Sequence, residues 1–179
     1  MEQKIIISGL GGQGVVFLTR LLTKTAVSLG QPALVSESHG MSRRGGAVIS
    51  HLRIGGSEAP LIRRGTADLL IALEESEAIS NFTFLRQGGV AFVNTPNSLP
   101  PKLMVQLNQL DITVHCLSAS QIALDLGAVA ITNVVMAGFA HPFPFQAMRD
   151  AIVALASRRA DLNLQALDAG YKESTHATI

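Results

Sequence analysis

The feature that most constrains the fold is a glycine-rich turn between a short apolar run and an amphipathic segment. Residues 9–14 read Gly-Leu-Gly-Gly-Gln-Gly and contain the spacing Gly-x-Gly-x-x-Gly. The run Ile5 to Ile7 before the turn predicts a strand that is buried on both faces. After the turn, apolar residues recur at helical spacing, at Val15, Leu18, Leu22, Ala26 and Leu29. A strand, a glycine turn and a helix in this order predict the first unit of a parallel α/β sheet.

Such a turn can approach a ligand closely, because glycine has no Cβ, and the helix behind it offers free N–H groups to an anion. Glu37 lies 23 residues after Gly14, roughly where a dinucleotide-binding fold places an acid that binds ribose. Four interpretations stay open: a dinucleotide, another anion, a subunit contact, or close packing of helix on sheet. The candidate residues of the turn are Gly9, Gly11, Gly12, Gln13 and Gly14.

Strands and helices alternate along the rest of the chain. The predicted strands cover 32–35, 48–54, 69–73, 90–94 and 112–117. The predicted helices cover 76–85 (closed by Gly88 and Gly89), 103–110, 119–126, 129–140, 145–156 and 160–170. This order predicts an α/β fold with a Rossmann-like, mainly parallel sheet flanked by helices. The segment 47–64 interrupts the alternation and predicts a hairpin or an antiparallel edge, and the C-terminal third is predicted to be helical.

The amino-acid composition excludes several classes of protein. The 179 residues are 47% apolar and 15% charged, with a mean hydropathy of +0.34, and we expect one domain over 1–179. This excludes a disordered chain and indicates a well-buried core or a large covered surface. The formal charge of +1 gives no general electrostatic case for binding nucleic acid or a membrane. No apolar run is long enough to cross a bilayer, and residues 1–4 do not resemble a signal peptide, so a cytoplasmic protein is expected.

Cysteine and histidine usage limits the chemistry. The single cysteine, Cys116, excludes an internal disulfide and an all-cysteine zinc or iron–sulfur site held by this chain alone, and we expect it in the core. The five histidines lack the spacing of metal ligands, so no metal site is expected. No Gly-x-Ser-x-Gly nucleophile motif occurs, and no catalytic residue is assigned.

The most unusual segment is a loop after the second predicted strand, which should lie beside the glycine-rich turn. Residues 38–46 read Ser-His-Gly-Met-Ser-Arg-Arg-Gly-Gly. Five arginines and one acid lie between Arg43 and Arg64, whereas residues 68–77 hold four acids and no base. Arginine binds carboxylates and phosphates with two parallel hydrogen bonds, so a local basic surface is predicted here. The candidate residues of this loop are Ser38, His39, Gly40, Met41, Arg43, Arg44, Gly45 and Gly46.

Together, these two motifs resemble the gamma-type subunit of 2-oxoacid:ferredoxin oxidoreductases, over about residues 3–172. The wording Ser-His-Gly-Met-Ser is most similar to the small subunit of indolepyruvate oxidoreductases; pyruvate and 2-oxoglutarate members more often carry tyrosine at His39. Arg43 departs from relatives that often have glutamine or valine there. Residues 132–138 resemble the family's asparagine-bearing helix, which makes Asn133 a further candidate, and residues 167–171 resemble its C-terminal helix.

The resemblance implies a division of labour. Thiamine diphosphate with magnesium and the iron–sulfur clusters are expected in partner subunits, and electrons leave to ferredoxin or another acceptor. This chain would bind no cofactor covalently, would contact coenzyme A and substrate, and would be inactive and able to self-associate when isolated. The aryl-pyruvate type is favoured, with phenylglyoxylate and branched-chain types open.

Two other functions remain open from the residues. The first is a free-standing NAD(P)- or FAD-dependent oxidoreductase that uses the glycine turn and Glu37. The second is a binding module whose loop docks a partner without touching a ligand.

Overall fold

One mixed sheet organises the chain. The structure is a computed structural model that describes residues 2–40, 45–56, 59–156 and 160–176. Its six strands lie in the order β2-β3-β1-β4-β5-β6. The strands are β1 (Gln3–Leu10), β2 (Ala33–His39), β3 (Ala47–Ile54), β4 (Ala67–Ala72), β5 (Leu85–Asn94) and β6 (Thr113–Leu117). The helices are α1 (Val15–Ser28), α2 (Glu75–Asn81), α3 (Pro101–Gln109), α4 (Ala119–Asp125), α5 (Thr132–Ala140), α6 (Phe145–Leu155) and α7 (Ala160–His176), with short 3₁₀ turns η1 (Phe82–Phe84) and η2 (Val129–Ile131).

The expected α/β class is confirmed, and so is the antiparallel excursion. Strands β1, β4, β5 and β6 run parallel, whereas β3 is antiparallel to both of its neighbours, β1 and β2. The β2–β3 hairpin therefore inserts β3 between β1 and β2. Strand β2 is pushed to the edge of the sheet, one position further from β1 than in a dinucleotide-binding fold.

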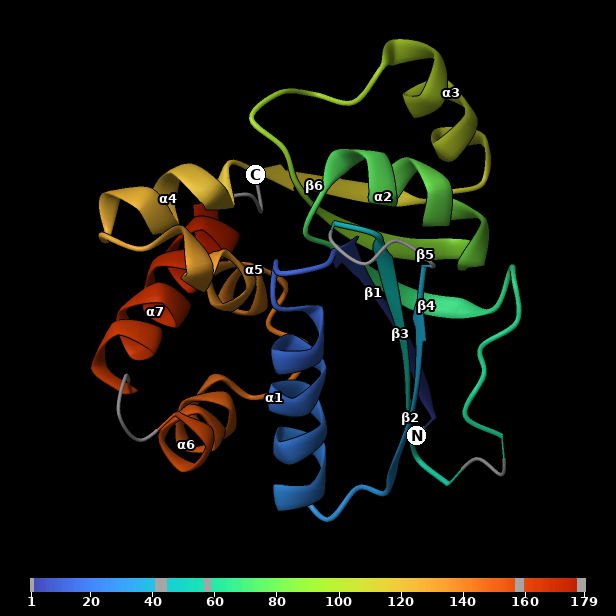
Figure 1. Ribbon diagram of the computed structural model, residues 1–179. Helices are drawn as coiled ribbons and strands as arrows, with labels where there is room; N and C mark the ends of the chain where they lie inside the picture. The colour runs from blue at the N-terminus through green and yellow to red at the C-terminus, as the bar shows by residue number, and fades with distance from the viewer. Residues whose placement is uncertain (1, 41–44, 57–58, 157–159, 177–179) are drawn as a thin grey trace.

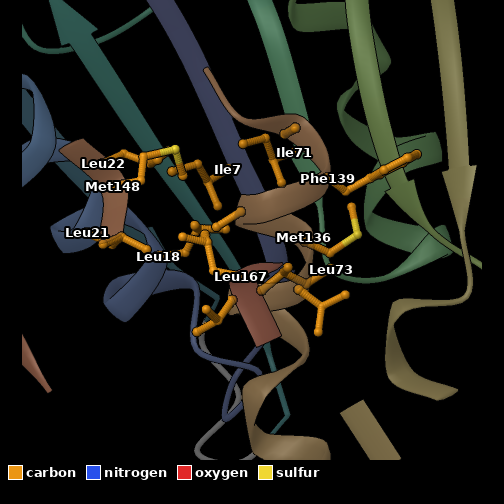
Figure 2. Close-up of a cluster of buried hydrophobic side chains, with 14 of the residues drawn as sticks. Ile7, Leu18, Leu21, Leu22, Ile71, Leu73, Met136, Phe139, Met148 and Leu167 are labelled. Carbon is orange, nitrogen blue, oxygen red and sulfur yellow. The ribbon is translucent and has the colours of Figure 1, made fainter. Parts of the chain in front are cut away.

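Helices cover both faces of the sheet. Figure 1 shows α1 and the C-terminal helices α4 to α7 on one side, and α2 with α3 on the other. The larger apolar cluster joins β1, β3 and β4 to α1 and the C-terminal helices, and the smaller one joins the opposite face to α2 and α3. In Figure 2, Leu18 and Leu22 of α1, Met136 and Phe139 of α5, and Leu167 of α7 meet in one cluster over β1 and β4. Burial of this stripe stabilises the layer by about 25 cal/mol per Å² of apolar surface.

Helix α5 is buried along its whole length, which requires an unusually close crossing with α7. A Cβ built on Gly138 would lie 2.1 Å from the carbonyl oxygen of Leu167, and one built on Gly170 would lie 1.9 Å from that of Val135. Each glycine thus lets the backbone of its helix touch the backbone of the other. The two helices approach more closely than any pair of side chains would allow.

Two local expectations were wrong. Gly88 and Gly89 do not close a helix: α2 ends at Asn81, and both glycines lie within β5, where the register with β4 shifts between Ala67 and Leu69. Paired glycines at a strand irregularity look the same in sequence as a helix end. Cys116 is exposed on the edge strand β6 and is not a core residue; partial burial nonetheless raises the pKa of its thiol.

A buried histidine of β3 forms a hydrogen bond with the connection between β3 and β4. His51 of β3 is 6% exposed, and its Nδ1 accepts a hydrogen bond of 3.2 Å from the N–H of Ile62. Its ring meets that of Phe84 edge to face at 5.4 Å. Burial lowers the pKa of His51 below its ordinary value, because the charged ring would lose water here. The neutral ring is therefore the form that fits.

Within the described residues, none of the helices is both long and apolar enough to cross a membrane.

The α5–α7 crossing predicts a large effect of one methyl group. Gly138→Ala should lower the free energy of unfolding by at least about 2 kcal/mol, because the helices must separate. Helix propensity alone would raise it by about 1 kcal/mol. Chemical denaturation measures the change, with the exposed α7 substitution Gln165→Ala as the control within about 0.5 kcal/mol of wild type. A neutral Gly138→Ala would contradict the close crossing.

The lowered pKa of His51 predicts a pH dependence of stability. Below about pH 6.5 the unfolded chain binds a proton at this histidine that the folded chain resists, so stability falls as the pH drops. His51→Gln keeps an acceptor but cannot titrate, and it should flatten this loss between about pH 7.5 and 5.5. The exposed, non-titrating substitution Gln165→Ala serves as control and should keep the wild-type slope. Equal slopes in all three proteins would disprove the assignment.

Candidate functional site

The candidate site lies where the parallel strands end. The helices that follow β1 and β4 lie on opposite faces of the sheet, which makes the gap between their carboxyl ends the topological switch point. In open α/β sheets, ligands bind outside the strand ends at this point. The glycine-rich turn follows β1, and Leu73, Glu74 and Glu75 follow β4.

The turn is sterically tight at its two ends. A Cβ on Gly9 would lie 2.9 Å from Gln13 Oε1 and 3.1 Å from the Cβ of Leu73. Gly14 has a φ of +86° and its Cβ direction is filled by Asn133, whose Nδ2 would be 2.3 Å away. Gly12 also has a positive φ, of +96°, but open space around it, and a Cβ on Gly11 would meet only ordinary contacts. Gly9 and Gly14 are therefore required by packing, and Gly12 by its backbone conformation.

Several N–H groups of the turn already have partners inside the protein. The N–H of Gly11 donates to the carbonyl of Gly46 at 2.9 Å, and that of Gln13 to the carbonyl of Leu10 at 3.1 Å. The N–H of Leu10 donates to the Gln13 side-chain oxygen at 2.7 Å. These three donors are not free for a phosphate, so the turn is more a self-supporting loop than an open anion cradle.

Gln13 connects the ends of β1 and β4. While its Oε1 accepts from Leu10, its Nε2 donates to Glu74 Oε2 at 2.8 Å. One side chain thus spans the switch point and fixes its width. The periodicity of the sequence gives no sign of this role, because Glu74 is 61 residues away.

Asn133 connects the helical layer to the glycine-rich turn. Its side chain is 3% exposed, its Nδ2 donates to the Gly14 carbonyl at 3.0 Å, and its Oδ1 accepts from the N–H of Val134. The structure thus brings Asn133 to the glycine-rich turn, 119 residues earlier in the chain. Both halves of the amide are satisfied within the protein, so its observed contact positions the start of α1.

The second motif is the tip of a hairpin. Ser38 and His39 lie in β2, and Gly40 and Ala47 pair at the base of the tip, where the N–H of Gly40 donates to the Ala47 carbonyl at 2.7 Å. Gly45 has a φ of +74°. The bond between Gly11 and Gly46 confirms that this hairpin lies beside the glycine-rich turn. Three candidate positions lie outside the described residues: Met41, Arg43 and Arg44.

Polar residues that the sequence did not single out line the other side of the site. A cleft of about 410 Å³ is bordered by Glu74, Glu75, Thr95 and Ser118, and a smaller one of about 230 Å³ is bordered by Gly12, Gln13 and Thr132. Ser120 and Val129 line both clefts, which are therefore contiguous. Of these residues, Glu74, Thr95 and Ser118 come directly after predicted strands, and this position is their only signal in the sequence.

Asn94, at the end of β5, forms hydrogen bonds with two segments that border these clefts. Its Nδ2 donates to the Leu73 carbonyl at 3.0 Å and to Ser120 Oγ at 2.9 Å, and its Oδ1 accepts from the N–H of Ser120 at 3.2 Å. Nearby, the Thr95 hydroxyl donates to Glu75 Oε2 at 2.6 Å. The strand ends are thereby tied together by side-chain hydrogen bonds.

The larger cleft is lined by acidic side chains. The described lining of the larger cleft contains Glu74 and Glu75 and neither lysine nor arginine. Of the arginines expected in the basic surface, Arg53 is paired with Glu2, and Arg64 lies 5.6 Å over the Phe84 ring. An anion is thus disfavoured at the ends of β4 and β5.

The position of Glu37 does not suit a ribose. Glu37 pairs with Ser50 of β3, which in turn pairs with Ile7 of β1. Two strand spacings, about 10 Å, therefore separate it from β1, where a dinucleotide fold needs one. The inserted strand β3 is the physical reason.

The Gln13 bridge predicts a compensated charge change. Gln13→Glu should place two carboxylates together and lower the free energy of unfolding by about 1–2 kcal/mol at pH 8. At pH 5 the loss should shrink as a proton is shared. The double variant Gln13→Glu with Glu74→Gln should recover most of the stability. Thermal unfolding of the wild type, both single variants (Gln13→Glu and Glu74→Gln) and the double variant checks this, and additive losses would contradict the contact.

Comparison with known families gives a single answer. The model of the family "Pyruvate ferredoxin/flavodoxin oxidoreductase" matches residues 4–173. Among curated relatives, the chain is 34% identical to indolepyruvate oxidoreductase subunit IorB of Archaeoglobus fulgidus, covering 97% of this chain and 96% of that protein. It is 30% identical to the gamma subunit of the NADH-dependent phenylglyoxylate dehydrogenase of Aromatoleum evansii, covering 92% and 90%. Pyruvate synthase subunit PorC of Methanothermobacter marburgensis is 29% identical over 75% of this chain and 73% of its own.

Solved structures share the fold. The gamma subunit of a keto/oxoacid ferredoxin oxidoreductase from Geobacter sulfurreducens superposes with a TM-score of 0.77 at 24% identity, over 97% of this chain and 99% of that one. The 2-oxoglutarate:ferredoxin oxidoreductase of Magnetococcus marinus, solved with 2-oxoglutarate, coenzyme A and succinyl-CoA bound, superposes with a TM-score of 0.79 at 15% identity. The match covers 98% of this chain and 31% of that larger chain. The chain therefore belongs to the pyruvate ferredoxin/flavodoxin oxidoreductase family, as the gamma subunit of a multisubunit 2-oxoacid:ferredoxin oxidoreductase.

Proposed function

We propose that this subunit serves an oxidoreductase of the aryl 2-oxoacid type, with indolepyruvate as its substrate. The observation that carries the proposal is the pattern of relatives. Indolepyruvate and phenylglyoxylate subunits match over 92–97% of the chain, whereas the pyruvate subunit matches over 75%. Both of the longer matches carry an aromatic 2-oxoacid in their names.

The overall reaction is oxidative decarboxylation: a 2-oxoacid anion and coenzyme A give an acyl-CoA, carbon dioxide, one proton and two electrons for ferredoxin. Thiamine diphosphate, when bound in a partner subunit, supplies the carbanion chemistry. A chain with one cysteine cannot supply the four ligands of a cluster, so the electron carriers also belong to partners.

This chain's part is to complete the cleft in which coenzyme A and substrate meet, and to form the interface with the thiamine-carrying subunit. The charge division supports a direction for the anion. Glu74 and Glu75 repel phosphate at the strand ends, whereas the hairpin tip carries Arg43 and Arg44 in sequence. The bridges from Gln13 and Asn133 hold the turn in one shape before a ligand arrives.

Purification of the tagged chain from its host tests the proposed substrate class and the proposed partner subunit. We expect a brown complex containing a thiamine-binding subunit, with highest kcat/KM for indolepyruvate among indolepyruvate, phenylglyoxylate, pyruvate and 2-oxoglutarate. A complex that prefers pyruvate or 2-oxoglutarate would overturn the aryl assignment.

Replacement of one arginine tests the proposed contact of this chain with coenzyme A or the 2-oxoacid. Arg44→Ala in the assembled complex should raise the KM for coenzyme A or the 2-oxoacid about 10- to 100-fold, because one charged hydrogen bond is lost. Arg63→Ala, at an exposed arginine away from the hairpin tip, is the matched control and should leave both KM values unchanged. Wild-type KM values for Arg44→Ala in an intact complex would exclude this contact.

A further inference from the structure

A series of hydrogen bonds runs from the end of β4 through the glycine-rich turn to the β2–β3 hairpin. Glu74 Oε2 accepts from Gln13 Nε2 at 2.8 Å, and Gln13 Oε1 accepts from the N–H of Leu10 at 2.7 Å. The next N–H along the chain, that of Gly11, donates to the Gly46 carbonyl at 2.9 Å. The end of β4, the turn and the hairpin are thus connected one after the other.

The end of this series at β4 is firmly held. The N–H of Leu73 donates to the Ser8 carbonyl at 2.8 Å, and the Leu73 carbonyl accepts from Asn94 Nδ2 at 3.0 Å. Glu74 therefore follows a residue whose backbone is bonded on both sides. Glu74 occupies the N-cap position of α2, but its side chain forms no capping hydrogen bond within the described chain. Its carboxylate can therefore be replaced without removing a helix cap.

Gln13 closes residues 10–13 into a compact ring. Its N–H donates to the Leu10 carbonyl at 3.1 Å, while its Oε1 accepts from the Leu10 N–H, so both backbone groups of Leu10 are bonded to one residue. Gly9 leaves room for the Gln13 side chain, because a Cβ at position 9 would lie 2.9 Å from Oε1. The turn therefore follows the position of Gln13, which Glu74 anchors.

The base of the hairpin lies directly against this ring. Leu10 is opposite Ala47 in the β1–β3 register, and the Ala47 carbonyl accepts from the N–H of Gly40 at 2.7 Å. Residues 41–44, which include Arg44, follow Gly40 in the sequence. The position of the base against the turn thus fixes the point from which this segment starts.

We propose that Gln13 and Glu74 are positioning residues for the anion contact of this subunit, because their hydrogen bond holds the hairpin base in one place. The inference rests on the proposed function, in which the hairpin contacts coenzyme A or the 2-oxoacid. In this role neither side chain touches the ligand. Their bond sets the distance between the end of β4 and the turn, and the Gly11–Gly46 bond passes that distance on to the hairpin.

The charge of Glu74 separates positioning from a simple electrostatic effect. A carboxylate near an anionic ligand repels it, so loss of the charge alone should lower the KM for that ligand or leave it unchanged. Loss of the hydrogen bond should instead raise the KM, because the hairpin base is released. Glu74→Gln removes the charge and keeps an acceptor for Gln13 Nε2, whereas Glu74→Ala removes both.

Steady-state kinetics of the assembled oxidoreductase tests the proposal. Glu74→Ala and Gln13→Ala should each raise the KM for coenzyme A or the 2-oxoacid at least about 5-fold, with kcat within about 2-fold of wild type, since only ligand binding is weakened. Glu74→Gln is the matched control and should have a KM at or below the wild-type value. Equal KM values in Glu74→Ala and Glu74→Gln, or a fall in kcat in place of the rise in KM, would overturn the proposal.

Amide hydrogen exchange separates this inference from the proposed function. In the whole chain with isotope-labelled glycine, the Gly11 amide should exchange at least about 10-fold faster in Glu74→Ala and Gln13→Ala than in wild type or Glu74→Gln. The Gly55 amide, which donates to the Pro32 carbonyl at the other end of the hairpin, is the internal control and should not change.

Two results of the exchange measurement would refute the positioning role: an unchanged rate at Gly11 in both alanine variants, or a faster rate there with wild-type KM values in the complex. A raised KM in Glu74→Ala beside a wild-type KM in Arg44→Ala would support the positioning role and overturn only the arginine contact of the proposed function.

Discussion

The close crossing of α5 and α7 is the constraint on which the rest of the molecule depends. Gly138 and Gly170 let two helix backbones touch, so α5 can lie buried between α7 and the sheet. That position brings Asn133, at the start of α5, to the Gly14 carbonyl. The turn that follows β1 is thereby held by a side chain from the far end of the sequence, which the close helix crossing puts in place.

The site is prepared by its own hydrogen bonds. Gln13 and Asn94 each join two strand ends, and Gly46 closes on Gly11 from the hairpin. Such mutual satisfaction means that little conformational entropy is left to lose when a partner subunit or ligand arrives. It also explains why a Gly-x-Gly-x-x-Gly pattern need not bind a dinucleotide: here three of its donors are used internally.

Much of the fold follows from sequence, because periodicity and turn residues are local signals. The β1–turn–α1 unit, the antiparallel excursion and the helical C-terminal third were predicted correctly. The insertion of β3 between β1 and β2 was not, since strand order depends on pairing between distant residues. The two glycines of β5 were wrongly interpreted as the end of a helix, because strand irregularities and helix ends both favour glycine. Glu74, Asn94 and Ser120 were missed for the same reason as the Gln13 bridge: only the folded chain brings them together.

The hairpin between β2 and β3 has an evolutionary consequence. Residues 40–46 form a connection between adjacent antiparallel strands, so insertions or deletions at its tip leave the β2–β3 ladder and the helices where they are. A crossover helix in the same place would transmit each length change into the core. Descendants of such a chain can therefore change the length and the side chains of this connection without rebuilding the sheet.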